Sequence, residues 1–472
     1  MSTTSLLNSL LGSSAPNLSS ILQAATGAYS AGIDVNAAVN SAVRAVQASE
    51  DTWKSQLAVL QSQSNALTAI QANVTNLDND MHALNNLTGP LSATTVTSSN
   101  ASIVTATAAS GSATGNNVVV VNNLASTASF SSSTVASSST ALPSESFTIT
   151  NNGGTAATIT TGSGVNTLAD LSTAINNAGL GLTASIINDA SGSRIAIASN
   201  TSGTNGNFTV TSSGSSFVFS QAVTGNNASL TVNGINILSA SNTVTGAAPG
   251  LTLNLLGASP GTSVSLLVAP NTAAATTAIN QFVTDYNTVI GDLNAEFSNT
   301  AGLGQGSLAQ DPTVRNLQNE LLQALNYTAP PAPGSSTTTV ANLTSLGLSV
   351  NTDGTLSVDS SKLTSILQNN FGDVQNFFQG ASLNGFGNSL DKQLTNFISP
   401  ADGAFTVDLQ SVGTQSRGLQ TNISNFEANV ITPLRAKLQS SLSQAEILLQ
   451  QLPAEMRQIS MELGQNTSST GG

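Results

Sequence analysis

The sequence predicts an α+β multidomain protein in which terminal helices form a coiled-coil or helical-bundle stalk, with antiparallel β domains inserted in the middle. Three observations support this prediction. Apolar residues recur at helical spacing near both ends of the chain. The middle consists of β-branched segments separated by Asn, Gly and Ser, and helical spacing returns after it. Narrow apolar seams of this kind are typical of helices that pack along other helices.

The two seams have regular spacing. The N-terminal seam repeats every seven residues from Val39, and the C-terminal seam alternates steps of four and three from Leu438. We expect the seams to pair with each other or with other copies of the chain. The candidate residues for these helix and oligomer contacts are Val39, Val46, Trp53, Leu60, Leu67, Val74, Met81, Leu438, Leu442, Leu449, Leu452, Met456, Ile459 and Leu463.

Composition excludes several classes of function. With 472 residues, the chain is long enough for several domains at roughly 150 residues each. Only 7% of the residues are charged and the net charge is -13, so the sequence offers no basic patch for nucleic acid. The absence of cysteine excludes disulfides, thiolate metal sites and cysteine nucleophiles. It also suits a chain that is exported unfolded.

The sequence shows neither a membrane span nor a cleaved secretory signal. No apolar run approaches the roughly 20 residues that a membrane-spanning helix needs. The first residues, MSTTSLLNSLLGSSAPN, contain no Lys or Arg before their apolar residues. We therefore expect no membrane insertion, and either a cytosolic location or export without a cleaved signal.

The N-terminal part is predicted to be flexible and then helical. We expect residues 1–30 to stay disordered until partners bury them. A helix should begin near Asp34, which can cap its first turn, and run with a possible break to about Leu87. Gly89 and Pro90 should end it.

The middle is predicted to be antiparallel sheet with one helix. Strand-like segments begin at about residue 94, and a helix with Leu168, Leu171 and Ile175 on one face interrupts them. Asn233-Gly234 lies between two apolar runs, which is the strongest short-range signal for a β-hairpin.

Helices are expected again from about residue 272, with a second hairpin turning at Asp353-Gly354. Pro433 follows Thr432, so we expect it at the start of a new helix rather than at a kink within one.

These elements give a nested domain order. We expect an N-terminal flexible segment and helix at 1–49, which acts as a leg and pairs with the C-terminal leg helix at 431–472. The stalk should comprise 50–87 and 271–430, the second part carrying a hairpin at 346–359. The first β domain should comprise 88–130 and 225–270, on either side of a second β domain with one helix at 131–224.

The sequence gives little indication of catalysis. His82 is the only histidine, no companions for it can be named from the sequence, and we interpret it as a surface helix position. Asn351 to Asp359 lacks the spacing and the closing Glu of a calcium loop, and a hairpin turn explains it better. Gly302 to Gly306 lacks the full dinucleotide-binding motif. We expect no catalytic, cofactor-binding or metal-binding residues, no cofactor and no enzymatic activity.

Several segments resemble the flagellar filament cap proteins, also called the hook-associated protein 2 family. Gly32 to Asn36 is similar to the start of the family's N-terminal helix, and Phe282 to Asn287 to a later helix signature. The most specific similarity is Leu346 to Leu363, which ends towards Phe377-Phe378. The other blocks that resemble the family are Leu168 to Asn176, Ala184 to Asn188, Ser193 to Gly203 and Asn242 to Leu253.

The resemblance implies a ring of about five copies at the distal tip of the bacterial flagellum. There the ring would hold exported flagellin while it folds and inserts, and would prevent its loss. The resemblance also implies hook-filament junction proteins and an export chaperone as partners. It further implies an extracellular location reached by the flagellar type III pathway, and a possible role in cell adhesion.

Two alternatives remain open from the residues alone. Flagellin or a hook-filament junction protein would share the helical termini and the β middle, although the segment from Asp353 to Asp359 is typical of caps. A surface adhesin would use the β middle to bind a ligand.

Overall fold

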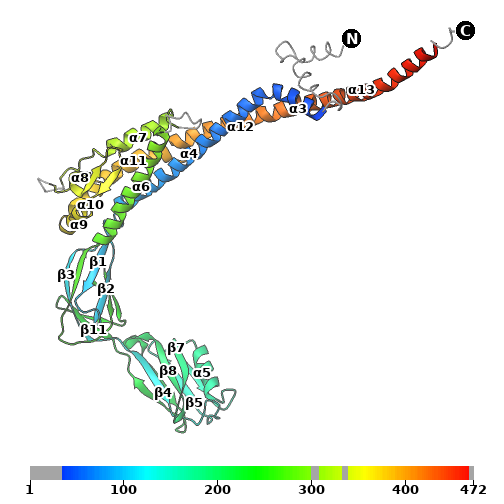
Figure 1. Ribbon diagram of the computed structural model, residues 1–472. Helices are drawn as coiled ribbons and strands as arrows, with labels where there is room; N and C mark the ends of the chain where they lie inside the picture. The colour runs from blue at the N-terminus through cyan, green and yellow to red at the C-terminus, as the bar shows by residue number, and fades with distance from the viewer. Residues whose placement is uncertain (1–34, 299–307, 332–337, 467–472) are drawn as a thin grey trace.

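The computed structural model describes residues 35–298, 308–331 and 338–466. Figure 1 shows an elongated, bent chain with helices at one end and two β domains at the other. The expected cap of the first helix, Asp34, lies outside the described residues, as do residues 1–30. The observed architecture confirms the predicted α+β fold class, with antiparallel sheets between helical segments.

The N-terminal part forms two helices separated at Gln47. They are α3 (Val35–Val46) and α4 (Ala48–Asn85), so the expected break falls between them. At the C-terminal end of α4, the buried amide of Gln379 donates to the carbonyl oxygens of Leu84 and Asn86 at 3.4 and 3.2 Å. This contact satisfies carbonyl groups that a helix end leaves without partners.

The first β domain consists of two antiparallel sheets around one core. Its five-stranded sheet has the order β1-β15-β3-β11-β12, and its three-stranded sheet the order β13-β14-β2. The strands are β1 (Thr94–Ser98), β2 (Val104–Ala108), β3 (Gly115–Asn123), β11 (Ala228–Val232), β12 (Ile235–Ser239), β13 (Thr243–Ala248), β14 (Leu251–Leu255) and β15 (Val264–Pro270). Alternate residues such as Val119, Leu230 and Leu266 are buried in the core between the sheets, as period-two patterning requires.

The predicted hairpin at Asn233-Gly234 is confirmed. β11 and β12 pair in antiparallel register with Val232 opposite Ile235. Asn233 and Gly234 have φ angles of 50° and 83°, which is the left-handed backbone that a two-residue type I′ turn needs.

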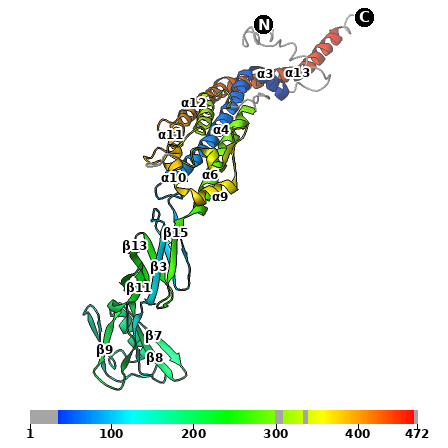
Figure 2. The same cartoon turned by 90° about the vertical axis from the view of Figure 1, so that its left-hand side faces the viewer.

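The second β domain is inserted between β3 and β11, and Figure 2 shows it at the end of the molecule opposite the terminal helices. Its sheets have the orders β10-β4-β8-β7 and β6-β5-β9. The elements are β4 (Thr127–Ser132), β5 (Ser146–Asn151), β6 (Ala156–Thr160), α5 (Leu168–Asn177), β7 (Leu182–Asp189), β8 (Gly192–Ser202), the short 3₁₀ helix η1 (Thr204–Gly206), β9 (Phe208–Ser212) and β10 (Phe219–Val223). β4 extends across residues 130 and 131, where the sequence suggested a domain boundary, so that boundary does not coincide with a loop.

The single helix predicted in this region is α5, and its sequence explains where it begins. Thr167 accepts a hydrogen bond from the backbone N–H of Asp170, whose carboxylate accepts in return from the backbone N–H of Thr167. This reciprocal capping box satisfies two orphan donors of the first turn. Leu168, Leu171 and Ile175 then face the core of the second β domain.

The helical domain contains α4 and the helices that follow the β domains. These are α6 (Thr272–Ser298), α7 (Pro312–Ala324), α8 (Leu343–Leu346), α9 (Ser360–Asn369), α10 (Phe371–Gln379), α11 (Phe386–Ile398) and α12 (Ala404–Phe426), with the hairpin β16 (Leu348–Val350) and β17 (Leu356–Val358) between α8 and α9. α4 packs against α6, α11 and α12, and its apolar side chains share one core with theirs. The hairpin predicted at Asp353-Gly354 is confirmed by the pairing of β16 with β17.

The C-terminal helices form one continuous helical rod. α12 continues through the π-helical segment η3 (Glu427–Ile431) into α13 (Thr432–Asn466). α13 therefore begins beside Pro433, as expected, but it extends α12 instead of starting after a loop. A wider π turn explains this arrangement, because proline has no N–H and its ring clashes with the carbonyl four residues earlier in an α-helix.

Candidate assembly surface

The N-terminal seam first contacts the C-terminal helix. Val39 and Val43 of α3 are buried against Ile431 and Leu438, and Val46 and Leu442 pack at the edge of this cluster. Arg435 donates to the side-chain oxygen of Asn40 at 2.8 Å. The two sequence ends therefore meet within one chain, along the first turns of α13.

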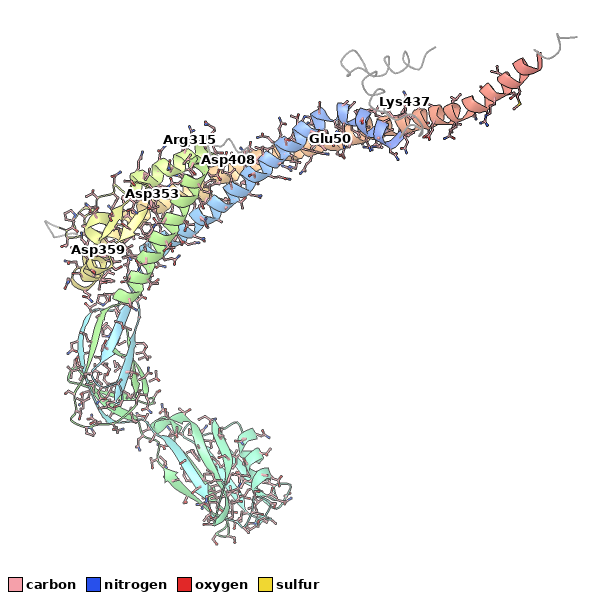
Figure 3. All side chains as sticks on the ribbon, in the orientation of Figure 1. Glu50, Arg315, Asp353, Asp359, Asp408 and Lys437 are labelled. Carbon is pink, nitrogen blue, oxygen red and sulfur yellow. The ribbon has the colours of Figure 1, made fainter. Side chains whose placement is uncertain are left out.

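A second group of contacts holds α4 to the π-helical segment. The ring of Trp53 packs edge-to-face on Phe426, with ring centroids 5.6 Å apart. Lys54 lies 3.4 Å from Glu427 and also pairs with the buried Glu50, which Figure 3 labels on this helix. Trp53 and Leu60 are half-buried at this point.

Further along α4 the seam enters the core of the helical domain. Leu67, Val74 and Met81 are fully buried in the core that α4 shares with the other helices of this domain. These three positions face the chain's own core, so they are not free to contact another copy. The seven-residue repeat thus continues through two different packing environments.

Beyond Leu442, several described apolar side chains of α13 are exposed, and Ile459 is the seam candidate among them. Figure 1 shows that α13 extends well past α3. Ile447, Leu448 and Ile459 are 56%, 64% and 55% exposed, and Met461 is 69% exposed. The side chains of the remaining candidates Leu449, Leu452, Met456 and Leu463 lie outside the described residues. The described part of this helix therefore presents large apolar side chains to solvent.

Two of the sequence blocks that resemble a family contact each other directly. The side-chain amide of Asn287 on α6 donates to the carbonyl oxygen of Leu356 at 2.8 Å, and its oxygen accepts from the N–H of Leu356 at 2.6 Å. The hydroxyl of Tyr286 donates to the carbonyl oxygen of Gly354 at 3.2 Å. Asn287 thus binds the free edge of β17 as a neighbouring strand would.

The hairpin turn has the geometry of a turn rather than of an ion site. The carboxylate of Asp353 accepts from the N–H and the hydroxyl of Thr355, and these bonds lower its pKa. Asp359 caps α9 by accepting from the N–H of Lys362 at 3.0 Å. Figure 3 labels both carboxylates at separate places in this region. The interpretation of this segment as a hairpin turn, rather than a calcium loop, agrees with these contacts.

We predict that Asn287→Leu lowers the free energy of unfolding of the helical domain by about 2–3 kcal/mol, because both backbone groups of Leu356 lose their partner. Urea unfolding followed by circular dichroism at the helix band measures this change. Asn280→Leu, an exposed position on the same helix, is the matched control and should change stability by less than about 0.5 kcal/mol. Equal effects of the two substitutions would contradict the role given to Asn287.

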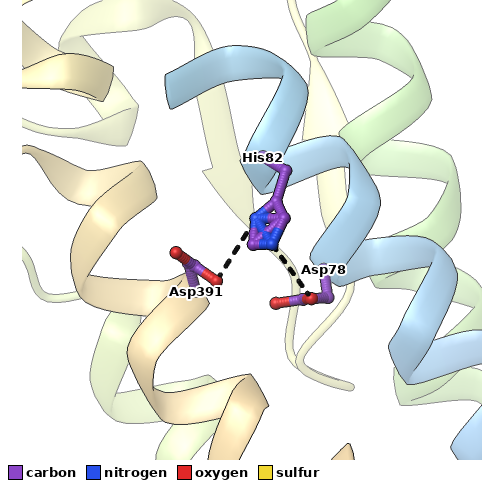
Figure 4. Close-up of side chains that lie close together, drawn as sticks. All are labelled: Asp78, His82 and Asp391. Carbon is purple, nitrogen blue, oxygen red and sulfur yellow. Dashed lines mark ion pairs between the residues drawn. The ribbon is translucent and has the colours of Figure 1, made fainter. Parts of the chain in front are cut away.

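The structure brings together one group of polar side chains that sequence reasoning missed. His82 lies beside Asp78, one turn earlier on α4, and beside Asp391 on α11, as Figure 4 shows. The spacing of Asp78 and His82 on one helix face was visible in the sequence, but the approach of α11 was not. Among the described residues, this is the only group of three such side chains close enough to share a metal ion.

No helix within the described ranges has the length and apolar character to cross a membrane.

Comparisons with known proteins give consistent similarities. The model for the N-terminus of flagellar hook-associated protein 2 matches residues 31–128, and the model for its C-terminus matches residues 225–454. B-type flagellar hook-associated protein 2 of Pseudomonas aeruginosa is 27% identical over 343 residues, which is 66% of this chain and 69% of the relative. The protein of Escherichia coli K12 is 27% identical over 327 residues, which is 64% and 68% of the two chains.

A solved structure extends the similarity to the fold. The D1-D2-D3 domains of the flagellar cap protein FliD from Escherichia coli match with a TM-score of 0.57 and 27% identity. The match covers 74% of this chain and 99% of that chain.

The helical domain, the nested β domains and the terminal helix seam, taken with these similarities, define a structural protein of the flagellar cap class. Two models of one family together span most of the sequence in the expected order. The chain belongs to the flagellar hook-associated protein 2 family.

Proposed function

We propose that this protein caps the flagellar filament as a homo-oligomer at the tip, where it promotes the folding and insertion of exported flagellin and prevents its loss. Family membership and the likeness to a structure named as a flagellar cap protein support this role. The role is one of assembly and needs no enzymatic activity.

The exposed apolar part of α13 is the observation that most supports a role in assembly. Exposed apolar side chains such as Leu448 and Met461 are costly to leave in water, and burial by a partner stabilises them by about 25 cal/mol for each Å² covered. A neighbouring copy of the chain or the filament is the proposed partner. α3 and α13 then act as a leg, and the β domains form the plate that faces arriving subunits.

The same proposal names the other partners and the route. We infer a closed ring, because closure satisfies every interface, and the family resemblance implies about five copies in it. Hook-filament junction proteins lie beneath the ring before flagellin is added, and an export chaperone binds the chain before secretion. Export follows the flagellar type III pathway, which is compatible with a sequence that has no cysteine.

Sedimentation and complementation test this function together. The purified protein should form rings with legs in electron micrographs and sediment as an oligomer at micromolar concentration. It should restore filament growth to a strain that lacks its own cap gene and that leaks flagellin into the medium. A protein that stays monomeric at every concentration and does not rescue that strain would refute the proposal.

We predict that Val43→Asp reduces complementation at least tenfold, measured as the fraction of cells with filaments. The new carboxylate would lie in the apolar contact between α3 and α13, where burial of an unpaired charge is unfavourable. Ala45→Asp adds the same charge on the exposed face of α3 and is the matched control. Normal filament growth in the Val43 variant would show that this contact is dispensable.

A further inference from the structure

Three ligand-type side chains converge where α4 packs against α11. The Nε2 atom of His82 lies 3.7 Å from Oδ2 of Asp78, and its Nδ1 atom lies 3.5 Å from Oδ1 of Asp391. One potential ligand atom from each residue lies within 4.8 Å of those of the other two. In Figure 4 the imidazole lies between the two carboxylates. Asp78 and His82 are four residues apart, a spacing that puts both on one face of the helix.

The backbone geometry brings the two helices close together at this point. A Cβ added to Gly387 on α11 would lie 1.9 Å from the side-chain oxygen of Asn85 on α4, so any larger residue would force the Asn85 side chain to move. Asn85 faces Gly387 and His82 faces Asp391, which means that the two helices run antiparallel here. The packing of the helices therefore sets the position of Asp391 relative to His82.

Apart from His82, no basic side chain among the described residues is paired with these two carboxylates. Asp78 is only 7% exposed, and its Oδ1 atom has no hydrogen-bond partner. Within the described part of the chain, no Lys or Arg pairs with Asp78 or Asp391. Burial, followed by the charge of Asp391, raises the pKa of Asp78 to about 6. A buried carboxylate beside a second one is unfavourable without a neutralising positive charge.

We propose that Asp78, His82 and Asp391 bind a divalent transition-metal ion such as Zn²⁺, which links α4 to α11. Zn²⁺ is bound by imidazole nitrogen and carboxylate oxygen at about 2.0–2.2 Å, so its ligand atoms lie roughly 3.3 Å apart. The 3.7 Å separation involves Nε2 and the 3.5 Å separation involves Nδ1, and an ion binds only one ring nitrogen. One ligand atom from each residue lies within 4.8 Å of the other two, so rotations of the side chains would bring three ligand atoms around one ion. The orphaned Oδ1 of Asp78 is the buried group that the ion neutralises.

The chemistry of the three ligands selects the type of ion. Ca²⁺ requires six to eight oxygen ligands and Mg²⁺ retains most of its waters, so neither suits a site with one imidazole and two carboxylates. The side chain of His82 is 57% exposed, so an ion can enter from solvent and water can complete its coordination. The ion would stabilise the end of α4 from which the chain continues into the β domains.

Because His82 is the only histidine, its imidazole signals in an NMR spectrum report on this site alone. The test uses the full chain without a histidine tag, titrated with ZnCl₂ in chelator-free buffer by calorimetry and NMR. We expect one Zn²⁺ per chain, shifted His82 signals and a raised melting temperature. Ca²⁺ at millimolar concentration should produce none of these changes.

Substitutions of the proposed ligands test whether Zn²⁺ binds at these residues. His82→Gln and Asp391→Asn should each weaken Zn²⁺ binding by at least about a hundredfold, more than the loss of an outer hydrogen-bond partner costs. Asp51→Asn, an exposed position on the same helix, should bind as the unmodified protein does. Equal Zn²⁺ affinity in the His82 variant, or no binding by the unmodified chain, would overturn the proposal and leave an ion-pair cluster.

Discussion

Phe386→Ala is expected to lower the free energy of unfolding of the helical domain by about 3–5 kcal/mol. Phe386 is fully buried at the start of α11. Its ring stacks on Phe377 with centroids 5.3 Å apart, and it contacts Phe282 and Phe378 at 5.8 and 5.9 Å. One side chain therefore connects three helices, α6, α10 and α11. Its removal leaves a cavity that helices fixed on several sides cannot fill by collapsing.

Urea unfolding followed at the helix band measures this loss. Phe386→Leu should cost less than the alanine variant, because leucine fills part of the volume. Val407→Ala on α12 removes an apolar side chain that is 53% exposed and is the control. We expect it to change stability by less than about 0.5 kcal/mol. A loss below about 1 kcal/mol for Phe386→Ala would show that the aromatic cluster is not a central part of this core.

The sequence was sufficient to predict those elements whose structure depends on residues close together in the chain. The turn at Asn233-Gly234 needs left-handed backbone, and those two residues adopt it readily, so the hairpin could be predicted. The reciprocal cap between Thr167 and Asp170 similarly determines where α5 begins. In both cases the decisive residues lie within a few positions of each other.

Contacts between distant segments could not be derived in this way. The seven-residue repeat predicted that Val39 and Val74 lie on a helix seam, but not that Val39 packs with residues of α13 while Val74 is buried in the core of the helical domain. The same limit applies to polar groups. Nothing within the sequence near His82 indicates Asp391, because more than three hundred residues separate them and only the packing of α11 brings them together.

A pH-dependent change in stability is the second large effect, and Asp80→Asn should remove much of it. Asp80 on α4 faces Asp285 on α6, and no N–H group or hydroxyl of the described residues donates to its buried Oδ2. Burial, then a hydrogen bond to the Asp285 carboxyl and the charge on that group, raises the pKa of Asp80 to about 7. Gln281 donates to Asp285 at 3.0 Å, and no basic side chain is paired with either carboxyl in the described structure.

Proton linkage determines whether the stability of the folded protein rises or falls with pH. An aspartate in the unfolded chain has a pKa of 3.8, so between about pH 4 and 7 the folded state holds a proton that the unfolded state releases. The contribution of Asp80 to the free energy of unfolding is therefore fully present below about pH 4, and it is lost as the pH rises through about 7. Above that pH, both carboxylates are charged and repel each other across the interface between α4 and α6.

Asp80→Asn keeps a neutral side chain that can still donate to Asp285 at every pH. We expect the variant to be more stable than the unmodified protein at pH 8 by about 1–2 kcal/mol, after allowance for screening by solvent. The two should be nearly equal at about pH 3.5, below the pKa of 3.8 that aspartate has in the unfolded chain. Urea unfolding at both pH values measures the difference in the free energy of unfolding, and Asp51→Asn, exposed on the same helix, is the control.

Because Asp78 titrates in a neighbouring pH range, the variant is compared with the unmodified protein at the same pH. A variant that is no more stable than the unmodified protein at pH 8 would show that the Asp80–Asp285 pair does not strain this interface.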